Sequence, residues 1–407
     1  MKVRSSRKML KWTILVIAMF QMPALAISPA IAKIMDQFGR ELVTVQTVLQ
    51  MPNLISPFAS ILASIIIAKA NGRISKKAVI ITGLACIVAA ATGMALLSGE
   101  FWTLYIWGAL IGIALGLFIP TTASLMMDSF DEDEVRVLSG QQTSFINIGG
   151  IIMSILGGIL ADVVWFGGYL TFYFGVPIII MCAIFLPARK RASEQAEKAV
   201  SASGEDGGRS RFDPNVLLYG VIIFFFMMMY SVSGSNISVY VIDQLQLGSA
   251  STTGYITAVQ MLGGACSGLL FGKLSARLRD YMIPLAFLML CIGFTILGLA
   301  SSLALIFVGS FIAGSAISMC MPQCMFSISL YVDENTSTFA NAISSSIAPS
   351  LGGFLSPRIF TTITTRLFGE SISDRFLFLA GTTLVFCIVF IAVMTARKKG
   401  GRARGWA

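Results

Sequence analysis

The run LALIFVGSFIAGSAISMCMPQCMFSISL, residues 303–330, contains no charged side chain. A helix needs about 20 apolar residues to cross the roughly 30 Å hydrocarbon core of a bilayer. Because lipid offers the backbone no hydrogen-bond partner, such a run crosses the membrane as a helix. Residues 303–330 therefore predict a transmembrane helix.

Eleven further stretches have the same character. The chain is 56% hydrophobic and 12% charged, with a mean hydropathy of +0.82, whereas a soluble domain carries about 25% charged residues. The approximate spans are 12–33, 43–67, 78–97, 102–126, 138–161, 168–186, 215–241, 252–271, 282–300, 303–330, 339–362 and 375–396. We expect an all-α membrane protein with 12 transmembrane helices.

The positive charges indicate the orientation of the chain. The formal net charge is +9, from 29 Lys and Arg against 20 Asp and Glu. If the amino terminus is cytoplasmic, 24 of the 29 basic residues lie in cytoplasmic segments; the other five are Lys33, Arg40, Arg358, Arg366 and Arg375. Because cytoplasmic loops carry the excess of basic residues, we expect both termini in the cytoplasm. This placement argues for membrane orientation rather than nucleic acid as the role of the charge.

The first span has an alternative interpretation. Residues 2–11, the apolar run that follows and Ala24-Leu25-Ala26 imitate a secretory signal with its cleavage site. Cleavage would leave eleven spans and reverse the charge bias, so we retain this helix. Because we find no transit or secretory extension beyond residues 1–11, we expect a prokaryotic plasma membrane, the inner or cell membrane.

A polar segment separates two sets of six spans. It reads PARKRASEQAEKAVSASGEDGGRSRFDP, and this composition is typical of a flexible linker. Across it, Gly112 and Pro120 have the same spacing as Gly314 and Pro322. We therefore expect two pseudo-symmetric six-helix bundles, at residues 1–186 and 215–407, joined by a cytoplasmic linker at residues 187–214.

Three loops resemble those of a known family. Residues 272–277, GKLSAR, resemble the loop signature of the major facilitator superfamily, roughly G-x-L-x-D-R-x-G-R-R. The copy at 68–77 keeps the basic positions but has Ala68, Gly72 and Ser75 in place of Gly, Asp and Gly. Residues 131–136 are similar to the family's acidic-then-Arg junction. In organisation, the resemblance covers the whole chain.

The resemblance implies a transporter of alternating access, in which two bundles rock about a site near the middle of the membrane. It also implies charged contacts at a cytoplasmic gate, involving Arg73, Lys76, Arg277, Glu134 and Arg136, with the acids of 131–134 as partners. The alternative is that the basic residues only set topology, which we favour for Lys76.

Two exporter features of the family are incomplete. Gly108 stands where many proton-coupled exporters have an Arg, and the pattern in the fifth span has Met153-Ser154 in place of Gly-Pro. Because the chain has no His, the candidates for proton coupling are the acids at helix ends, Asp36 and Asp243. Two alternatives remain. The protein is a facilitator without proton coupling, or the true span edges differ from the predicted ones by one turn and place an acid deeper in the membrane.

Uncharged polar residues predicted at mid-depth are candidate substrate ligands, since each needs a partner in an apolar medium. Spans one, four, seven and ten line the family's cavity, so the candidates are Gln21, Asn236 and Gln323, then Gln260, with Tyr230 and Phe326 as aromatic walls. Hydrogen bonds between helices are their alternative role. Arg358 either meets an anionic substrate or extends to the outer interface.

The sequence does not support an enzyme, because it lacks a Ser/His/Asp set, a metal cluster and a phosphate-binding loop. Cys320 and Cys324 lie one helical turn apart, but without His or a nearby acid we expect no metal site and no cofactor. All seven Cys fall in predicted spans, so no disulfide framework is indicated.

We expect secondary active or facilitative transport of a small neutral or amphipathic organic solute, by a monomer in the bilayer. Proton-coupled multidrug efflux of lipophilic cations is the first alternative. A receptor or scaffold that uses the same fold without transport is the second.

Overall fold

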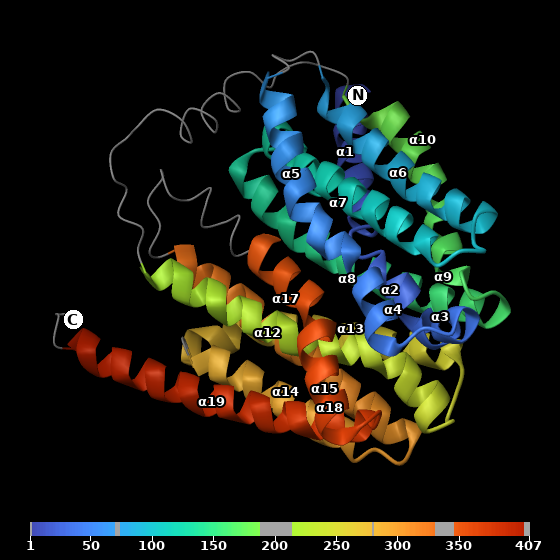
Figure 1. Ribbon diagram of the computed structural model, residues 1–407. Coiled ribbons are helices and arrows are strands. Elements are labelled where there is room, and N and C mark those ends of the chain that lie inside the picture. Colours follow the sequence, from blue (N-terminus) through green and yellow to red (C-terminus); the bar gives the residue numbers. More distant parts are fainter. Residues whose placement is uncertain (1, 70–73, 188–213, 279–280, 330–345, 403–407) are drawn as a thin grey trace. The chain divides into compact units, whose positions relative to one another are not determined.

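The computed structural model describes residues 2–69, 74–187, 214–278, 281–329 and 346–402 (Figure 1). These residues form helices and turns, and no strand occurs among them, which confirms the expected all-α fold. The chain divides into two compact units. Unit 1 comprises residues 1–210 and 249–255, and unit 2 comprises residues 211–248 and 256–407.

Unit 1 contains the helices of the first six predicted spans. Short 3-10 turns at Ser28–Ala30 and Thr171–Phe174 connect some of them. The α-helices are α1 (Lys2–Ala18), α2 (Ala24–Ile27), α3 (Ile31–Phe38), α4 (Leu42–Leu49), α5 (Met51–Lys69), α6 (Lys76–Leu96), α7 (Trp102–Ser129), α8 (Glu132–Val163), α9 (Gly167–Leu170) and α10 (Gly175–Phe185).

Unit 2 contains most of the helices of the last six predicted spans. Two π-helical turns, Tyr240–Gln244 and Pro357–Thr361, interrupt the regular α pattern. The α-helices are α12 (Pro214–Val239), α13 (Ala250–Leu278), α14 (Met282–Gly298), α15 (Leu303–Ser329), α17 (Ala348–Ser356), α18 (Thr362–Phe368) and α19 (Ile372–Arg402). The first turn of α13 belongs to unit 1.

Within the described ranges, helical segments lie in each of the predicted spans, while residues 339–345 of the eleventh span lie outside the described residues. In the described part of the chain, eight helical segments are long and apolar enough to cross a membrane: 76–96, 102–129, 137–163, 167–185, 215–244, 250–278, 303–328 and 372–395. The first span is broken into α1, α2 and α3, and the second into α4 and α5. The linker residues 188–213 lie outside the described residues.

Glycines on α7 allow the close approach of α5 in unit 1. A Cβ atom on Gly116 would lie 2.5 Å from the Ser56 carbonyl oxygen and 2.6 Å from the Ala59 Cβ. One on Gly112 would lie 2.8 Å from the Ile55 Cβ. These distances are too short for real atoms, so only glycine at these positions lets the backbones of α5 and α7 approach so closely.

We predict that Gly116→Ala lowers the melting temperature of the detergent-purified protein, because the new methyl group forces α5 and α7 apart. Overpacking of this kind costs about 1–3 kcal/mol. Gly381→Ala is the matched control, since Gly381 is exposed on α19 and its added Cβ would meet nothing within 4 Å. An equal effect of both substitutions would contradict the packing role.

Candidate functional site

The first membrane span is interrupted around Gln21. Helix α1 ends at Ala18, α2 begins at Ala24, and residues 19–23 form turns between them. The Gln21 Nε2 atom is buried and has no hydrogen-bond partner. Leaving a buried polar group unpaired costs about 1–3 kcal/mol. Gln21 therefore retains a donor that a bound solute can use, at a break of the kind that forms binding sites in transporters.

Helix α8 packs directly against this interruption. A Cβ on Gly149 would overlap the backbone of Met19, and one on Gly157 would overlap the carbonyl oxygen of Ala26. Only glycine leaves room for the backbone on both sides of Gln21. The fifth span, in which the sequence showed half of an exporter signature, thus supports the broken first span.

Tyr230 on α12 and Gln260 on α13 are two predicted site residues that the structure brings together in unit 2. Their side chains form a hydrogen bond. The Tyr230 ring also stacks on Phe226, with the ring centroids 6.1 Å apart and the planes at 13°. Gln260 is only 5% exposed. The pair forms an uncharged surface that is both polar and aromatic.

Gln323 is fully engaged inside unit 2. Its Oε1 atom accepts a hydrogen bond from the Ser275 hydroxyl at 2.8 Å, and its Nε2 donates to the Ser327 hydroxyl at 3.4 Å. The side chain is buried. This geometry matches the alternative role, an interhelical link between α13 and α15.

Asn236 belongs to a buried network around Arg375, a residue that the sequence places at the outer end of the last predicted span. Arg375, in the first turn of α19, is 1% exposed. Its Nη1 donates to the Asn236 Oδ1, its Nε to the Thr364 hydroxyl at 2.9 Å, and its Nη2 to the Thr365 hydroxyl at 3.1 Å. Asn236 also donates to the Val232 carbonyl at 2.8 Å.

The ion pairs of the described residues involve Arg7 and Lys76 but not Arg375. Glu370 attracts the Arg375 guanidinium from a greater distance. A buried charge is costly unless it is hydrogen-bonded, so three neutral acceptors hold Arg375 in place. The sequence offered one signal of this role, a basic residue at the first position of an apolar span.

Two further substrate candidates have exposed side chains. Phe326 lies on α15, and Arg358 lies in the π-helical turn Pro357–Thr361. Exposure of Arg358 agrees with its alternative role as an interface anchor.

Lys76 has a specific acidic partner at the end of α7. Its Nζ atom lies 2.5 Å from the Asp128 Oδ2 and 2.6 Å from the Ser124 hydroxyl. The Lys76 and Asp128 side chains are only 15% and 23% exposed. From the sequence we expected Lys76 only to set the membrane orientation, and residues 131–134 to be the acidic partners of the basic gate residues. The structure instead pairs Lys76 with Asp128.

The acidic junction contacts α1. The Arg7 Nη2 lies 3.0 Å from the Glu134 Oε2 and 3.6 Å from the Asp131 Oδ2. The Arg7 guanidinium also lies over the Phe130 ring, 5.6 Å from its centroid. Arg277 is exposed in the last turn of α13. Arg73 and the side chain of Arg136 lie outside the described residues.

Asp162, at the end of α8, caps the first turn of α13 within unit 1. Its Oδ1 accepts from the Ala250 N–H at 2.9 Å, and its Oδ2 accepts from the Ser251 N–H at 3.0 Å and the Ser249 hydroxyl at 2.8 Å. A carboxylate stabilises a helix amino terminus by satisfying free N–H groups and by facing the positive end of the helix dipole. The sequence had indicated only an acid at a helix end.

The coupling candidates Asp36 and Asp243 have exposed side chains, Asp36 on α3 and Asp243 in the π-helical turn Tyr240–Gln244. In the described part of the chain, the buried residues include no Asp or Glu. The Cys320 and Cys324 sulfurs are 4.0 Å apart. Within the described ranges, no group of three His, Cys, Asp or Glu is placed to hold a metal ion.

Many apolar helices, a broken first span and buried uncharged polar groups define the class of multi-pass membrane transporters. The sequence model of the Major Facilitator Superfamily matches the chain twice, over residues 13–248 and 220–405. The chain therefore belongs to the major facilitator superfamily. This membership supports membrane transport by alternating access, and identifies a transporter rather than an enzyme.

Solved structures share the fold at low sequence identity. A POT family transporter in complex with a thioalcohol-conjugated peptide has a TM-score of 0.77 at 10% identity, covering 97% of this chain and 96% of its own. The nucleoside transporter NupG has 0.75 at 11%, covering 95% and 99%. A bacterial homologue of the lysosomal transporter Spinster has 0.68 at 15%, covering 96% of both. No curated protein matches the sequence.

We predict that Asn236→Leu destabilises the protein, because it removes an acceptor from a buried guanidinium. Hydrogen bonds to charged groups contribute about 1.5–3 kcal/mol. Thermal unfolding in detergent measures the change. Asn53→Leu is the control, since within the described ranges the Asn53 side chain bonds only to Gln50 of its own span. The double variant Asn236→Leu/Arg375→Met should recover part of the loss by removing the buried charge; no recovery would argue against the coupling.

Proposed function

We propose that the protein transports a small neutral or amphipathic organic solute across the membrane by alternating access. The observation that carries this proposal is the buried, unpaired amide of Gln21 at the break in the first span. A neutral hydrogen-bonding group of the solute can satisfy this amide without a counter-charge.

Two further observations support this substrate class. The Tyr230–Gln260 pair offers aromatic and amide contacts, and the buried residues of the described ranges include no carboxylate that would attract a lipophilic cation. The structures of similar fold include a peptide complex and a nucleoside transporter. Such ligands are organic solutes that carry many hydrogen-bonding groups.

The charged contacts at the helix ends are proposed as gate elements. The Lys76–Asp128 pair joins α6 to α7 within unit 1, and Arg277 ends α13 in unit 2. Asp36 and Asp243 are the acids proposed for coupling if transport uses a proton gradient. A protonophore that abolishes transport would then indicate coupled rather than facilitative movement.

We predict that Gln21→Leu abolishes stabilisation by the substrate but not the stability of the empty protein. The free amide is unsatisfied in the structure, so its removal should leave the melting temperature unchanged or raise it. Wild type and variant are melted with neutral amphipathic metabolites, lipophilic cations or organic anions. A ligand at 100 times its dissociation constant stabilises by about 2.7 kcal/mol.

Gln323→Leu is the control for this experiment, since it breaks the links to Ser275 and Ser327. It should lower the melting temperature of the empty protein while the shift produced by the ligand persists. Stabilisation by lipophilic cations alone would contradict the proposed substrate class. A stabilising ligand whose shift survives Gln21→Leu would remove Gln21 from the site.

We also propose that the protein lies in a prokaryotic plasma membrane with both termini in the cytoplasm. The orientation follows from the excess of basic residues in alternate loops. A green fluorescent protein fused at the carboxy terminus should therefore be fluorescent, and alkaline phosphatase at the same position should be inactive. Active phosphatase would reverse the orientation. Fusion in the segment between α18 and α19 is the control and should give the opposite pair of results.

A further inference from the structure

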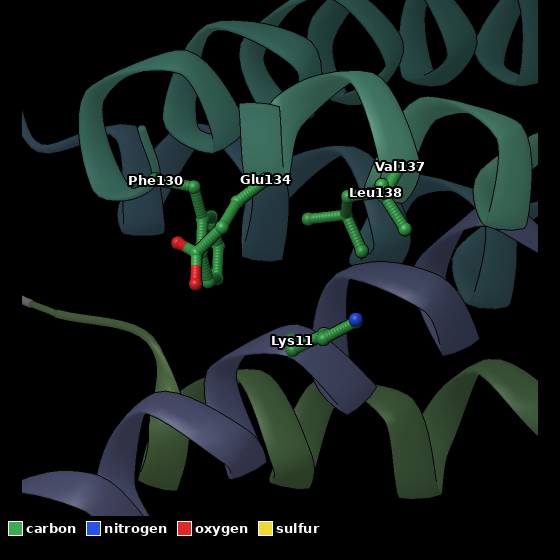
Figure 2. A pocket seen from close by; sticks show the side chains of 5 residues that line it. All are labelled: Lys11, Phe130, Glu134, Val137 and Leu138. Atoms are coloured by element: carbon green, nitrogen blue, oxygen red, sulfur yellow. The ribbon is translucent and has the colours of Figure 1, made fainter. Parts of the chain in front are cut away.

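A small pocket in unit 1 lies between α1 and the start of α8. Its volume is about 300 Å³, and it is lined by Lys11, Phe130, Glu134, Val137 and Leu138. Figure 2 shows the side chains of Glu134 and Leu138 on one side of the space and Lys11 on α1 across from them. The pocket contains none of the substrate candidates discussed above, and its wall combines apolar side chains with one cation and one carboxylate.

The floor of the pocket belongs to the apolar interior of unit 1. Phe130 and Leu138 are buried in a cluster with Ile14, Leu15 and Met126. Val137, by contrast, is 58% exposed. An apolar chain leaving the pocket can therefore continue over an apolar side chain without meeting water.

The pocket lies where α8 passes from polar to apolar sequence. Glu134 precedes the apolar segment 137–163, whereas Val137 and Leu138 are its first residues. On α1, Trp12 follows Lys11, is 54% exposed and contacts Phe145 edge-on, with the centroids 6.0 Å apart. Trp is enriched at the boundary between membrane and water. An occupant at this depth must be charged at one end and apolar at the other.

The two charged groups of the pocket retain binding capacity. In the described part of the chain, Lys11 forms no ion pair, and Glu134 contacts Arg7 through Oε2 alone. The Lys11 ammonium can donate to a phosphate, whereas the Glu134 Oε1 can accept from a primary ammonium. These two requirements, together with the apolar wall, describe the chemistry of one ligand class.

We propose that this pocket binds a zwitterionic phospholipid with a primary ammonium headgroup. The Lys11 ammonium donates to the phosphate, the Glu134 carboxylate accepts from the headgroup ammonium, and the acyl chains pass along Val137 into the bilayer. A choline headgroup carries no N–H to donate to Glu134. A glycerol headgroup carries no positive charge to offset the carboxylate, so the pocket distinguishes the three headgroups.

Native mass spectrometry of the full-length protein tests the proposal, with phosphatidylethanolamine, phosphatidylcholine and phosphatidylglycerol of identical acyl chains as probes. We expect phosphatidylethanolamine to be retained about tenfold more strongly than the other two. A tenfold factor corresponds to about 1.4 kcal/mol, close to the lower end of what one charge-assisted hydrogen bond contributes. Glu134→Gln should remove the preference over phosphatidylcholine. Lys11→Gln should weaken all three lipids.

Lys8→Gln is the matched control, since Lys8 is an exposed residue of α1 that does not line the pocket. It should leave retention unchanged. Melting curves verify that each variant is folded, which we expect because the Arg7–Glu134 ion pair is exposed and contributes little. Equal retention of the three lipids, a preference for phosphatidylglycerol, or equal effects of Lys8→Gln and Lys11→Gln would each overturn the proposal.

Discussion

The constraint on which this structure depends is that lipid cannot hydrogen-bond the protein backbone. Every departure from a regular helix inside the membrane must therefore be covered by other parts of the protein. At the first such departure, residues 19–23, the glycines of α8 bring a second backbone against Met19 and Ala26. The break in the first span and the glycines of the fifth span therefore act together. The glycines let α8 lie directly against the broken backbone and cover it.

The buried polar side chains fall into two kinds. Gln323 and Arg375 find partners on other helices, and so they link elements of unit 2. Gln21 lies instead in the turns between α1 and α2, and its Nε2 atom is buried without a hydrogen-bond partner. An unsatisfied group lowers stability, and Gln21 shares this property with Trp107, Ser233, Ser310 and Ser356. Its location at the break in the first span is the reason that we propose Gln21, among these residues, for solute binding.

The membrane architecture followed from sequence because uncharged runs of sufficient length have few alternatives to a transmembrane helix. The first span contains Pro23, a residue typical of a helix kink. The full break from 19 to 23 cannot be predicted from this residue, because it also depends on the packing of α8. The pairing of Lys76 with Asp128 was missed as well. Loop signatures indicate the sign of charge at a helix end, but not which acid on a neighbouring helix will reach it.

Arg375 shows the same limit more sharply, because its partner Asn236 lies 139 positions earlier in the chain. Hydropathy places a basic residue at a span edge in the aqueous loop by default. The Arg375 charge can be buried because the packing of α12, α18 and α19 supplies its hydrogen-bond acceptors. By sequence, Lys11 is only one of the basic residues that set topology. Its pocket cannot be predicted from the sequence, because the opposing wall comes from residues 130–138, far away in the chain.

The location of Arg375 also bears on how the protein is made. Helix α19 follows α12 and α18 in the chain, and an unpaired Arg costs about 2.5–3.5 kcal/mol at the centre of an inserting helix and less near its end. The acceptors of Arg375 on α12 and α18 are therefore synthesised before it. Arg375 is hydrogen-bonded only once α19 packs against these two helices, so the burial of its charge depends on helices that precede it in the chain.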